Sequence, residues 1–514
     1  MPRKLNIPLP SKGLVVDRPA EYVDERSASE TQNMEFNRAT IRKRIGTAAL
    51  GSSLGERIMR FFELQVGPLT RLFRVGPTEV EVLNKATSVW SSVTSTPLTG
   101  SADDPISFAF PLLAGAKIVV YTNFIDPIRK CSITGNDAAL GGSPPLAKFT
   151  QAFGPYLVIA HVTDSGDTFY SRVQWSDAGD PEVWTPADDN NAGSVDLLED
   201  PEDITGLGVF SNFLTVHKAN SIYVGQLVTT EDVFRFDRRA TGVGAVTGAV
   251  IANIPSGEQI FLASDGIHLF NGLTAPLIDS PVQDELREGM NPAYLHRSQA
   301  VFVEELDEVW FAIPMGSQTD PETVYKYNWR TKQIYKDMRD DLTALSVYLN
   351  TADLTWDDMT KAWDSATERW DSVLLSSLNP VVIFGDNSGD TTKRTAAATS
   401  DAGTAIDASW DTKDFTCTDL GEADIDKIVR WTGLEIWAKG GSLDVQYSTD
   451  GGESWSTATT LTLSSDYSDD TNPLNVYFDV LSSRIRFRFG NLSLTTSFTL
   501  KKYQIEGNMR EGRK

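Results

Sequence analysis

The sequence predicts an all-β protein: a β-propeller with an extended N-terminal arm and a C-terminal β-sandwich-like domain. From about Ile58 onward, short runs rich in β-branched and aromatic residues alternate with Gly, Asp, Asn and Pro, as strands alternate with turns. Helical periodicity is scarce over the same region. Hairpin-like phrases begin near residues 153, 210, 260 and 300, at intervals of roughly 40 to 60 residues, which overlap the length of a four-stranded propeller blade. Closure into a propeller hides strand edges, and an array of sandwiches is the main alternative.

The composition of the chain argues against some classes of function. The chain has 514 residues, which is too long for one ordinary core, and a net charge of −24. Because phosphates are held by clustered Lys and Arg, this charge argues against a broad grip on nucleic acid or on anionic membranes, although an acidic wall suits DNA that slides past. No apolar run reaches the ~18 residues of a membrane span, and no secretory signal is recognised, so we expect folding in a cytosol.

Residues 1–57 are expected to form the extended arm. Strand patterns are few there, and basic residues cluster in IRKRIG, residues 41–46. A charged segment with little core-forming pattern is expected to order only when it meets a neighbouring protein.

Residues 58–395 are expected to form the propeller. Strand-length runs such as KIVVYTNF, YLVIAHV and AVFVEELDEVWFAIP recur through it. Ser264, Asp265 and Gly266 lie between IFLA and IHLF, and an Asp-Gly pair suits a tight hairpin turn. The best short helix candidate is VQDELREG, residues 282–289.

A Trp-Asp ladder interrupts the propeller region at residues 355–372. Three Trp-Asp pairs recur there every seven residues: Trp356, Asp357, Trp363, Asp364, Trp370 and Asp371. Seven residues fit two helical turns, but the segment is short for a coiled coil and lies between two strand-like runs. The placement between strands favours a structural role for the indoles, with a stacking platform for sugar or base as the alternative.

Residues 404–510 are expected to form the C-terminal β-sandwich, after an Ala-rich linker at 396–403. The stretch STDGGESW within it fits an Asp-box pattern through Ser448, Asp450, Gly452 and Trp455. In that pattern the Asp and Ser cap a hairpin turn, Gly supplies an unusual φ and Trp covers neighbouring strands. A structural turn is the favoured interpretation of the single copy, and a sialidase-like or glycan-binding site is the alternative.

No catalytic, cofactor-binding or metal-binding residue is predicted. The four histidines form neither HExxH nor a partnership with a GxSxG nucleophile, and Cys131 and Cys417 stand far apart. Asp177, Asp180, Asp188 and Asp189 are conceivable calcium ligands, but the EF-hand spacing is absent, so a capped turn is favoured. Paired carboxylates for glycoside hydrolysis stay an open alternative, because their separation is spatial.

Several phrases resemble one known family, the β-propeller tail nozzle, tail tubular and hub proteins of tailed bacteriophages. One of them is SRVQWSDAGDPEVWTP, residues 171–186, and the phrases are more specific as a set than singly. The others are FSNFLTVHKANSIYVG, ASDGIHLFNG, VYKYNWRTKQIY, the Trp-Asp ladder, TQNMEFNRATIRKRIGT near the start, and RIRFRF with KKYQIEG near the end.

The resemblance implies a virion structural protein rather than an enzyme. Such a protein forms a homo-oligomer, a hexameric ring that surrounds the DNA channel of the tail for genome retention and ejection. Its implied partners are neighbouring portal, adaptor and tail proteins, with transient, non-specific contact to phage DNA. Its implied location is the virion tail, after assembly in the host cytoplasm. A tail-associated receptor or glycan-binding propeller is the first alternative, and a propeller glycosidase is the second.

Overall fold

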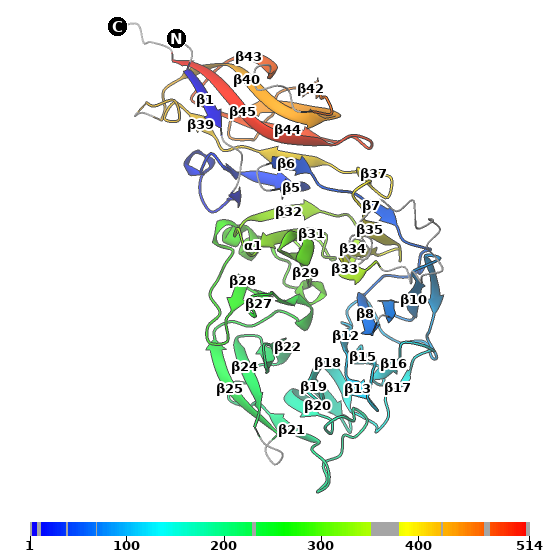
Figure 1. Cartoon of the computed structure of the whole chain (residues 1–514). Helices are drawn as coiled ribbons and strands as arrows, with labels where there is room; N and C mark the ends of the chain where they lie inside the picture. Colours follow the sequence, from blue (N-terminus) through cyan, green and yellow to red (C-terminus); the bar gives the residue numbers. More distant parts are fainter. Residues whose placement is uncertain are drawn as a thin grey trace, which may run out of the picture.

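The protein is all-β, as predicted. The computed structural model describes residues 3–7, 12–37, 40–67, 69–228, 233–350, 380–422, 425–466 and 473–509. Sheets form two bodies: a ring of blades, and a second body that lies against the rim of the ring beside β32 and β7 (Figure 1). The Trp-Asp ladder at residues 355–372 lies outside the described residues, so its packing role stays a prediction.

The ring is a β-propeller with seven sheets in the described part of the chain. The first strands of most successive sheets contact one another, and Phe62 of the first sheet meets Phe108 of the second with ring centroids 5.0 Å apart. Short, half-apolar strands form such blades because each sheet buries both faces against its neighbours. The first four blades consist of β8 (Arg60–Val66), β9 (Leu69–Val75), β10 (Val80–Asn84) and β11 (Val89–Ser92); β12 (Ser107–Ala109), β15 (Val119–Thr122), β16 (Arg129–Cys131) and β17 (Ala138–Ala139); β18 (Leu146–Phe153), β19 (Tyr156–Asp164), β20 (Asp167–Trp175) and β21 (Gly193–Asp196); and β22 (Ile204–Phe210), β23 (Phe213–Lys218), β24 (Ser221–Leu227) and β25 (Phe234–Thr241).

The remaining blades are less uniform. The fifth is three-stranded, and the seventh takes its fourth strand from the N-terminal region. They consist of β26 (Ile251–Asn253), β27 (Gln259–Ala263) and β28 (Gly266–Phe270); β29 (Gln299–Val303), β30 (Glu308–Ile313), β31 (Thr323–Asn328) and β32 (Ile334–Met338); and β33 (Leu342–Leu349), β34 (Pro380–Asp386), β35 (Thr391–Arg394) and β7 (Thr47–Ala49), extended by β36 (Ser400–Asp401) and β37 (Thr404–Ala405).

Helices are few, as the sequence predicts. The short helix α1 (Gln283–Gly289) covers the stretch expected to be helical, and Leu286 is its buried residue. A small hairpin, β13 (Leu112–Leu113) and β14 (Ala116–Lys117), follows β12. The single-turn 3-10 helices are η1 (Ala20–Tyr22), η2 (Gly248–Val250), η3 (Ser280–Val282), η4 (Leu295–Arg297) and η5 (Glu304–Leu306).

The C-terminal body is a two-sheet sandwich whose buried aromatic core includes Trp410, Trp431, Phe487 and Tyr503. Its long strands alternate apolar and polar residues, so one face of each sheet enters the core. One sheet contains β43 (Leu474–Ser482), β40 (Val429–Gly440), β45 (Phe498–Met509), β6 (Thr40–Lys43), β5 (Met34–Asn37) and β1 (Arg3–Ile7); the other contains β4 (Glu30–Gln32), β38 (Ala408–Asp411), β39 (Phe415–Thr416), β44 (Arg484–Asn491), β41 (Ser442–Ser448) and β42 (Thr459–Thr462).

The extended N-terminal arm of the sequence prediction is therefore corrected: residues 1–57 contribute strands to both bodies. β1 and β6 pair with β45, β4 pairs with β38, and β7 pairs with β35 of the seventh blade. The short strands β2 (Gly13–Leu14) and β3 (Ser27–Ala28) pair with each other. The segment lacks a long apolar run because each piece needs only one or two buried side chains, such as Met34 and Ile41, to join a core formed elsewhere.

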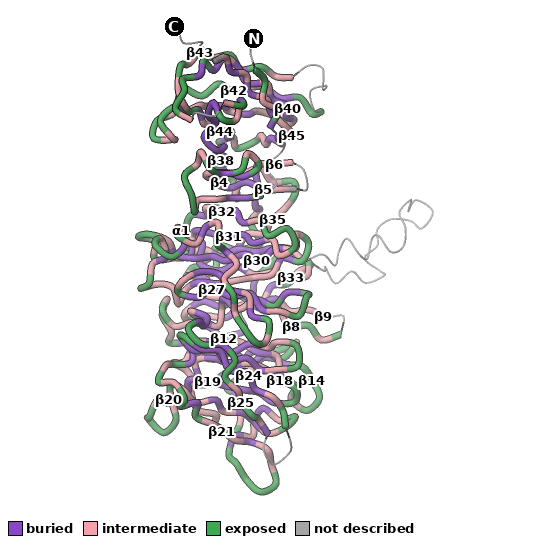
Figure 2. Tube along the Cα trace, turned by 90° about the vertical axis from the view of Figure 1, so that its left-hand side faces the viewer, coloured by how far each residue is buried: buried purple, intermediate pink, exposed green. Residues whose placement is uncertain are grey.

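A buried polar junction joins the sandwich to the propeller. The Arg44 side chain, 2% exposed, donates to Asp401 Oδ1 at 2.9 Å and to Asn33 Oδ1 at 2.9 Å. Asn33 Oδ1 also accepts the backbone N–H of Met338, the last residue of β32, at 3.0 Å. Buried residues continue from the sandwich through β4 and β5 to β32 (Figure 2), so the junction between the two bodies is itself buried.

Candidate functional site

The propeller axis holds two adjoining cavities. The smaller has a volume of about 30 Å³, room for about one water molecule, and the larger about 190 Å³. They share Arg60, Pro105, Ile106 and Ala249 in their walls. Both lie where the first strands of different blades converge, which is where propellers leave a channel.

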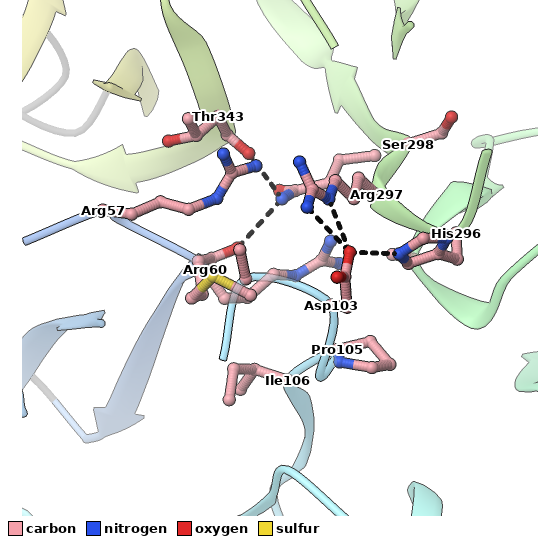
Figure 3. Close-up of a pocket in the computed structure, with 13 residues that line it drawn as sticks. Arg57, Arg60, Asp103, Pro105, Ile106, His296, Arg297, Ser298 and Thr343 are labelled. Atoms are coloured by element: carbon pink, nitrogen blue, oxygen red, sulfur yellow. Dashed lines mark hydrogen bonds and ion pairs between the residues drawn. The ribbon is translucent and has the colours of Figure 1, made fainter. Parts of the chain in front are cut away.

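Paired charges surround the smaller cavity. Asp103, from the connection between the first two blades, accepts hydrogen bonds from Arg297 at 2.7 Å and pairs with His296 Nε2 at 3.1 Å (Figure 3). Arg297 also donates to Asp320 Oδ1 at 3.0 Å, and Arg57 pairs with the same oxygen. The hydrogen bond from Arg297 lowers the pKa of Asp103. The network ties the sixth blade to the connection between the first two, and its charges are satisfied internally.

A glutamine joins three inner strands beside this network. Gln299 Nε2 donates to the backbone carbonyls of Met59 at 2.9 Å and Thr343 at 3.0 Å. Thr343 Oγ1 donates in turn to the carbonyl of Ile58 at 2.7 Å. These bonds close the ring between the sixth, seventh and first blades, and they use donors that the strand ladders leave free.

The larger cavity has a different character. Two basic residues, Arg60 of β8 and Lys148 of β18, line it together with Phe108, Phe149 and other uncharged residues. Among the described residues in its wall, none is Asp or Glu. Burial lowers the pKa of Arg60 to about 10, and burial also lowers the pKa of Lys148. The cavity is thus cationic inside an acidic protein.

The Asp-box residues come together as one turn after β41. Gly452 N–H donates to Ser448 Oγ at 2.9 Å, Ser448 Oγ donates to Asp450 Oδ1 at 2.6 Å, and Gly452 has a φ of 97°. Hydrogen bonds from Ser448 and Ser454 lower the pKa of Asp450 well below its usual range. The Arg488 guanidinium lies 4.0 Å from the centre of the Trp455 ring, so this indole already has a partner within the sandwich.

The acidic stretch after β20 is also built from turns. Asp177 Oδ1 accepts the N–H of Asn191 at 2.8 Å, Asp180 Oδ1 accepts the N–H of Glu182 at 2.9 Å, and Trp184 is buried. Asp188 and Asp189 are exposed. No group of three or more His, Cys, Asp or Glu side chains suited to a metal ion occurs in the described part of the chain.

The histidines and cysteines are dispersed. His268 contacts the carbonyl of Ala275 at 2.8 Å and Asp265 at 2.9 Å, while His217 is fully buried beside Phe261. Cys131 and Cys417 are buried, each in a different body. In the described segments, no helix is long and apolar enough to span a membrane.

The sequence did not indicate either axial cavity. Arg60 and Lys148 stand 88 positions apart, and neither belongs to a motif. The only available signal was that isolated basic residues occur inside strand-like runs of an acidic chain.

Comparison with known proteins gives distant likenesses to solved structures. No family model and no curated protein matches the chain. Among solved structures, BamB from Moraxella catarrhalis is similar with a TM-score of 0.36 and 12% identity, over 72% of this chain and 94% of that one. PorZ, a surface component of the type-IX secretion system of Porphyromonas gingivalis, is similar with a TM-score of 0.35 and 10% identity, over 80% of this chain and 46% of that one.

Proposed function

We propose that the protein is a bacteriophage virion structural protein, a tail nozzle or tail tubular protein whose copies form a ring around the DNA channel. The main support is the position in the fold of the sequence stretches that resemble tail proteins. FSNFLTVHKANSIYVG spans the β23–β24 hairpin, and VYKYNWRTKQIY spans the β31–β32 hairpin. SRVQW lies in β20, and ASDGIHLFNG includes β28. The resemblance therefore extends through four consecutive blades.

The charge of the folded chain supports the same proposal. Nine basic and seven acidic side chains are buried among the described residues, so burial removes more positive than negative charge from the surface. A surface poor in free Lys and Arg gives phosphates little to bind through counterion release. Such a surface lets DNA pass without being retained.

The junction between the two bodies supports a structural role. Strands from residues 1–57 complete the sandwich and the seventh blade, and the Arg44 cluster lies between the bodies. This construction resists relative motion of the bodies, which suits a subunit of a tail under the internal pressure of a packaged genome. The resemblance to tail proteins is also the basis for three further parts of the proposal. These are a hexameric ring, contacts with portal, adaptor and tail proteins, and a location in the virion tail.

Imaging tests the proposal. Negative-stain images of the purified protein should show closed rings with a central opening, and antibody against the protein should label the tail of the particle. Monomers at every concentration, with labelling absent from particles, would contradict it. A glycan array and turnover assays on sialosides and polysaccharides separate the two alternatives, because binding or hydrolysis there would favour a receptor-binding propeller or a glycosidase.

DNA binding provides a second test. The wild-type protein should bind DNA weakly and without sequence preference at physiological salt, because phosphate contacts require free basic side chains. In assembled particles, replacing acidic residues of the ring lumen by Lys should slow genome ejection without preventing assembly. Tight, sequence-selective binding by the purified wild-type protein would be inconsistent with a passage for DNA.

A further inference from the structure

The larger axial cavity has the features of a ligand site. Its walls come mainly from the first strands of the blades that begin at β8, β12, β18, β22 and β26, and the connections around Pro105 and Gly248 complete them. Its volume of about 190 Å³ is well above what one water molecule needs. A cavity of this size in a framework of inner strands is a built feature of the propeller.

Arg60 lacks the partner that other interior cations have. Its Nη1 atom is shielded from solvent and has no hydrogen-bond partner among the described residues, and its one contact of note is with the Phe108 ring at 5.7 Å. By contrast, Lys218 pairs with Asp200 at 2.6 Å, and Arg394 pairs with Glu35 at 3.0 Å. Shielding a guanidinium N–H group from water without giving it a hydrogen-bond partner is unfavourable for the empty protein.

Lys148 brings a second positive charge to the same space. No ion pair or hydrogen bond of this ammonium group occurs among the described residues, and its nearest aromatic contact is Phe149 at 5.8 Å. Asp104 and Asp203 act on it only at longer range and do not line the cavity. Thr150 adds a buried hydroxyl without a partner in the described structure.

The rest of the wall is apolar or weakly polar. Ile106, Leu207 and Ile251 supply aliphatic surface, and Phe108 and Phe149 supply aromatic surface. Two cations and a free hydroxyl among apolar groups match a small molecule that has an anionic head and an organic body. A DNA duplex is far too wide for a space of this volume, so the site is separate from any channel through the ring.

We propose that the axial cavity of the propeller binds a small organic oxyanion, with Arg60 and Lys148 holding its carboxylate or phosphate group. The ligand completes the interior of the propeller and stabilises the folded state by mass action. This inference concerns the single chain and does not depend on assembly into a ring.

Thermal unfolding of the full chain tests the site. The probes are inorganic phosphate, citrate and glucose 6-phosphate, compared with glucose and with sodium chloride at equal ionic strength. At least one anion should raise Tm along a saturable curve, whereas glucose and sodium chloride should not. The preference between citrate and the phosphates identifies the head group.

Variants locate the effect. Arg60→Met and Lys148→Met should each weaken the apparent Kd at least tenfold, while Arg235→Met, which removes a cation whose side chain is 71% exposed, should leave it unchanged. Without ligand, Arg60→Met should melt at or above the wild-type temperature, because Met needs no counter-charge. Should Arg60→Met not fold, the comparison of Lys148→Gln with wild type decides the same point.

Two results would overturn the proposal. The first is the absence of any saturable shift in Tm with all three anions up to tens of millimolar. The second is a shift that persists undiminished in the Lys148 variants, because the anion then binds elsewhere on the chain.

Discussion

Lys326 shows how single residues support this fold. Its ammonium group is fully buried in β31, pairs with Asp337 and lies 4.3 Å from the centre of the Trp310 ring. Glu35 and Glu308 are also buried nearby. Although burial alone would raise it, the charges of Arg394, Lys326 and Arg42 lower the pKa of Glu35 to about 2.

Lys326→Met should strongly destabilise the protein. Removing the cation leaves buried carboxylates without their partner, and breaking a buried pair in this way costs about 3 to 5 kcal/mol. Urea denaturation should show the loss as a lower midpoint. Lys332→Met, at an exposed turn of the same hairpin, is the control and should unfold close to wild type. Equal midpoints for the two variants would show that the buried cluster contributes little.

Asp279 should make the stability of the β27–β28 hairpin depend on pH. Its Oδ2 accepts the N–H of Ile267 at 2.8 Å, and a Cβ on Gly266 would lie only 2.4 Å from that oxygen, so the pair requires glycine. Burial raises the pKa of Asp279 from 3.8 to about 6.

A raised pKa means that the folded state binds the proton more tightly than the unfolded state does. The stabilisation from Asp279 is therefore complete below pH 3.8 and is lost as pH rises through about 6. In Asp279→Asn, the free energy of unfolding should vary less between pH 4 and 6 than in wild type. Chemical denaturation across that range measures the difference, and identical pH dependence in both proteins would contradict the assignment.

At the scale of elements, β7 closes the propeller. It adds residues 47–49 to the seventh blade, whose other strands lie more than 290 positions later in the chain. Leu50 N–H donates to the carbonyl of Thr391 at 2.8 Å, and Thr395 N–H donates to that of Gly46 at 3.2 Å. In an antiparallel ladder, hydrogen-bonded residue pairs alternate with pairs that are not hydrogen-bonded. Residues 46 and 50 of this segment are hydrogen-bonded to the β35 side, so Ala48, midway between them, is hydrogen-bonded to it as well.

Ala48→Pro should therefore open the seventh blade. Proline removes the N–H that faces β35, and an unmade backbone bond of this kind costs about 1 to 3 kcal/mol. Ala49→Pro is the matched control, because its N–H points away from β35 and the residue is exposed. Hydrogen exchange in β35 should increase in the first variant only. Equal exchange in both would show that β7 is not needed for closure.

At the scale of the whole molecule, the two bodies should unfold together. Strands β4, β5 and β6 pair within the sandwich and β7 pairs with the seventh blade, and Arg44 joins Asn33, Met338 and Asp401 across the junction. Calorimetry of wild type should show one transition, whereas Arg44→Met should show two, with the sandwich melting first. Arg430→Met, from an exposed pair with Asp479, should keep the single transition. Two transitions in wild type would contradict the coupling.

Because N-terminal strands belong to the sandwich, deleting the N-terminal residues should affect the folding of the monomer. An arm that orders only on assembly could be deleted without harm to the monomer. Residues 1–40 instead hold strands β1 and β4, which pair with β45 and β38, so their deletion should expose the sandwich core.

The fold class and several local features of this protein follow from its amino-acid sequence alone. Alternating β-branched runs and turn residues predicted an all-β chain, the stretch 282–289 predicted α1, and Asp265 with Gly266 predicted the β27–β28 hairpin. These features depend on neighbours a few positions apart, and their physical causes, backbone propensity and turn geometry, are local. The net negative charge also follows directly from the sequence, because it is a sum over all residues.

The pairing of the N-terminal strands and the residues that line the propeller axis depend on how the whole chain folds. β7 has no partner near it in the chain, and its place depends on the open edge that β35 presents. Arg60 and Lys148 meet in one cavity only because ring closure brings the first strands of separate blades together. Strand partners and cavities are set by contacts between distant residues, and a strand's own pattern specifies its buried face but not the edge that it will meet.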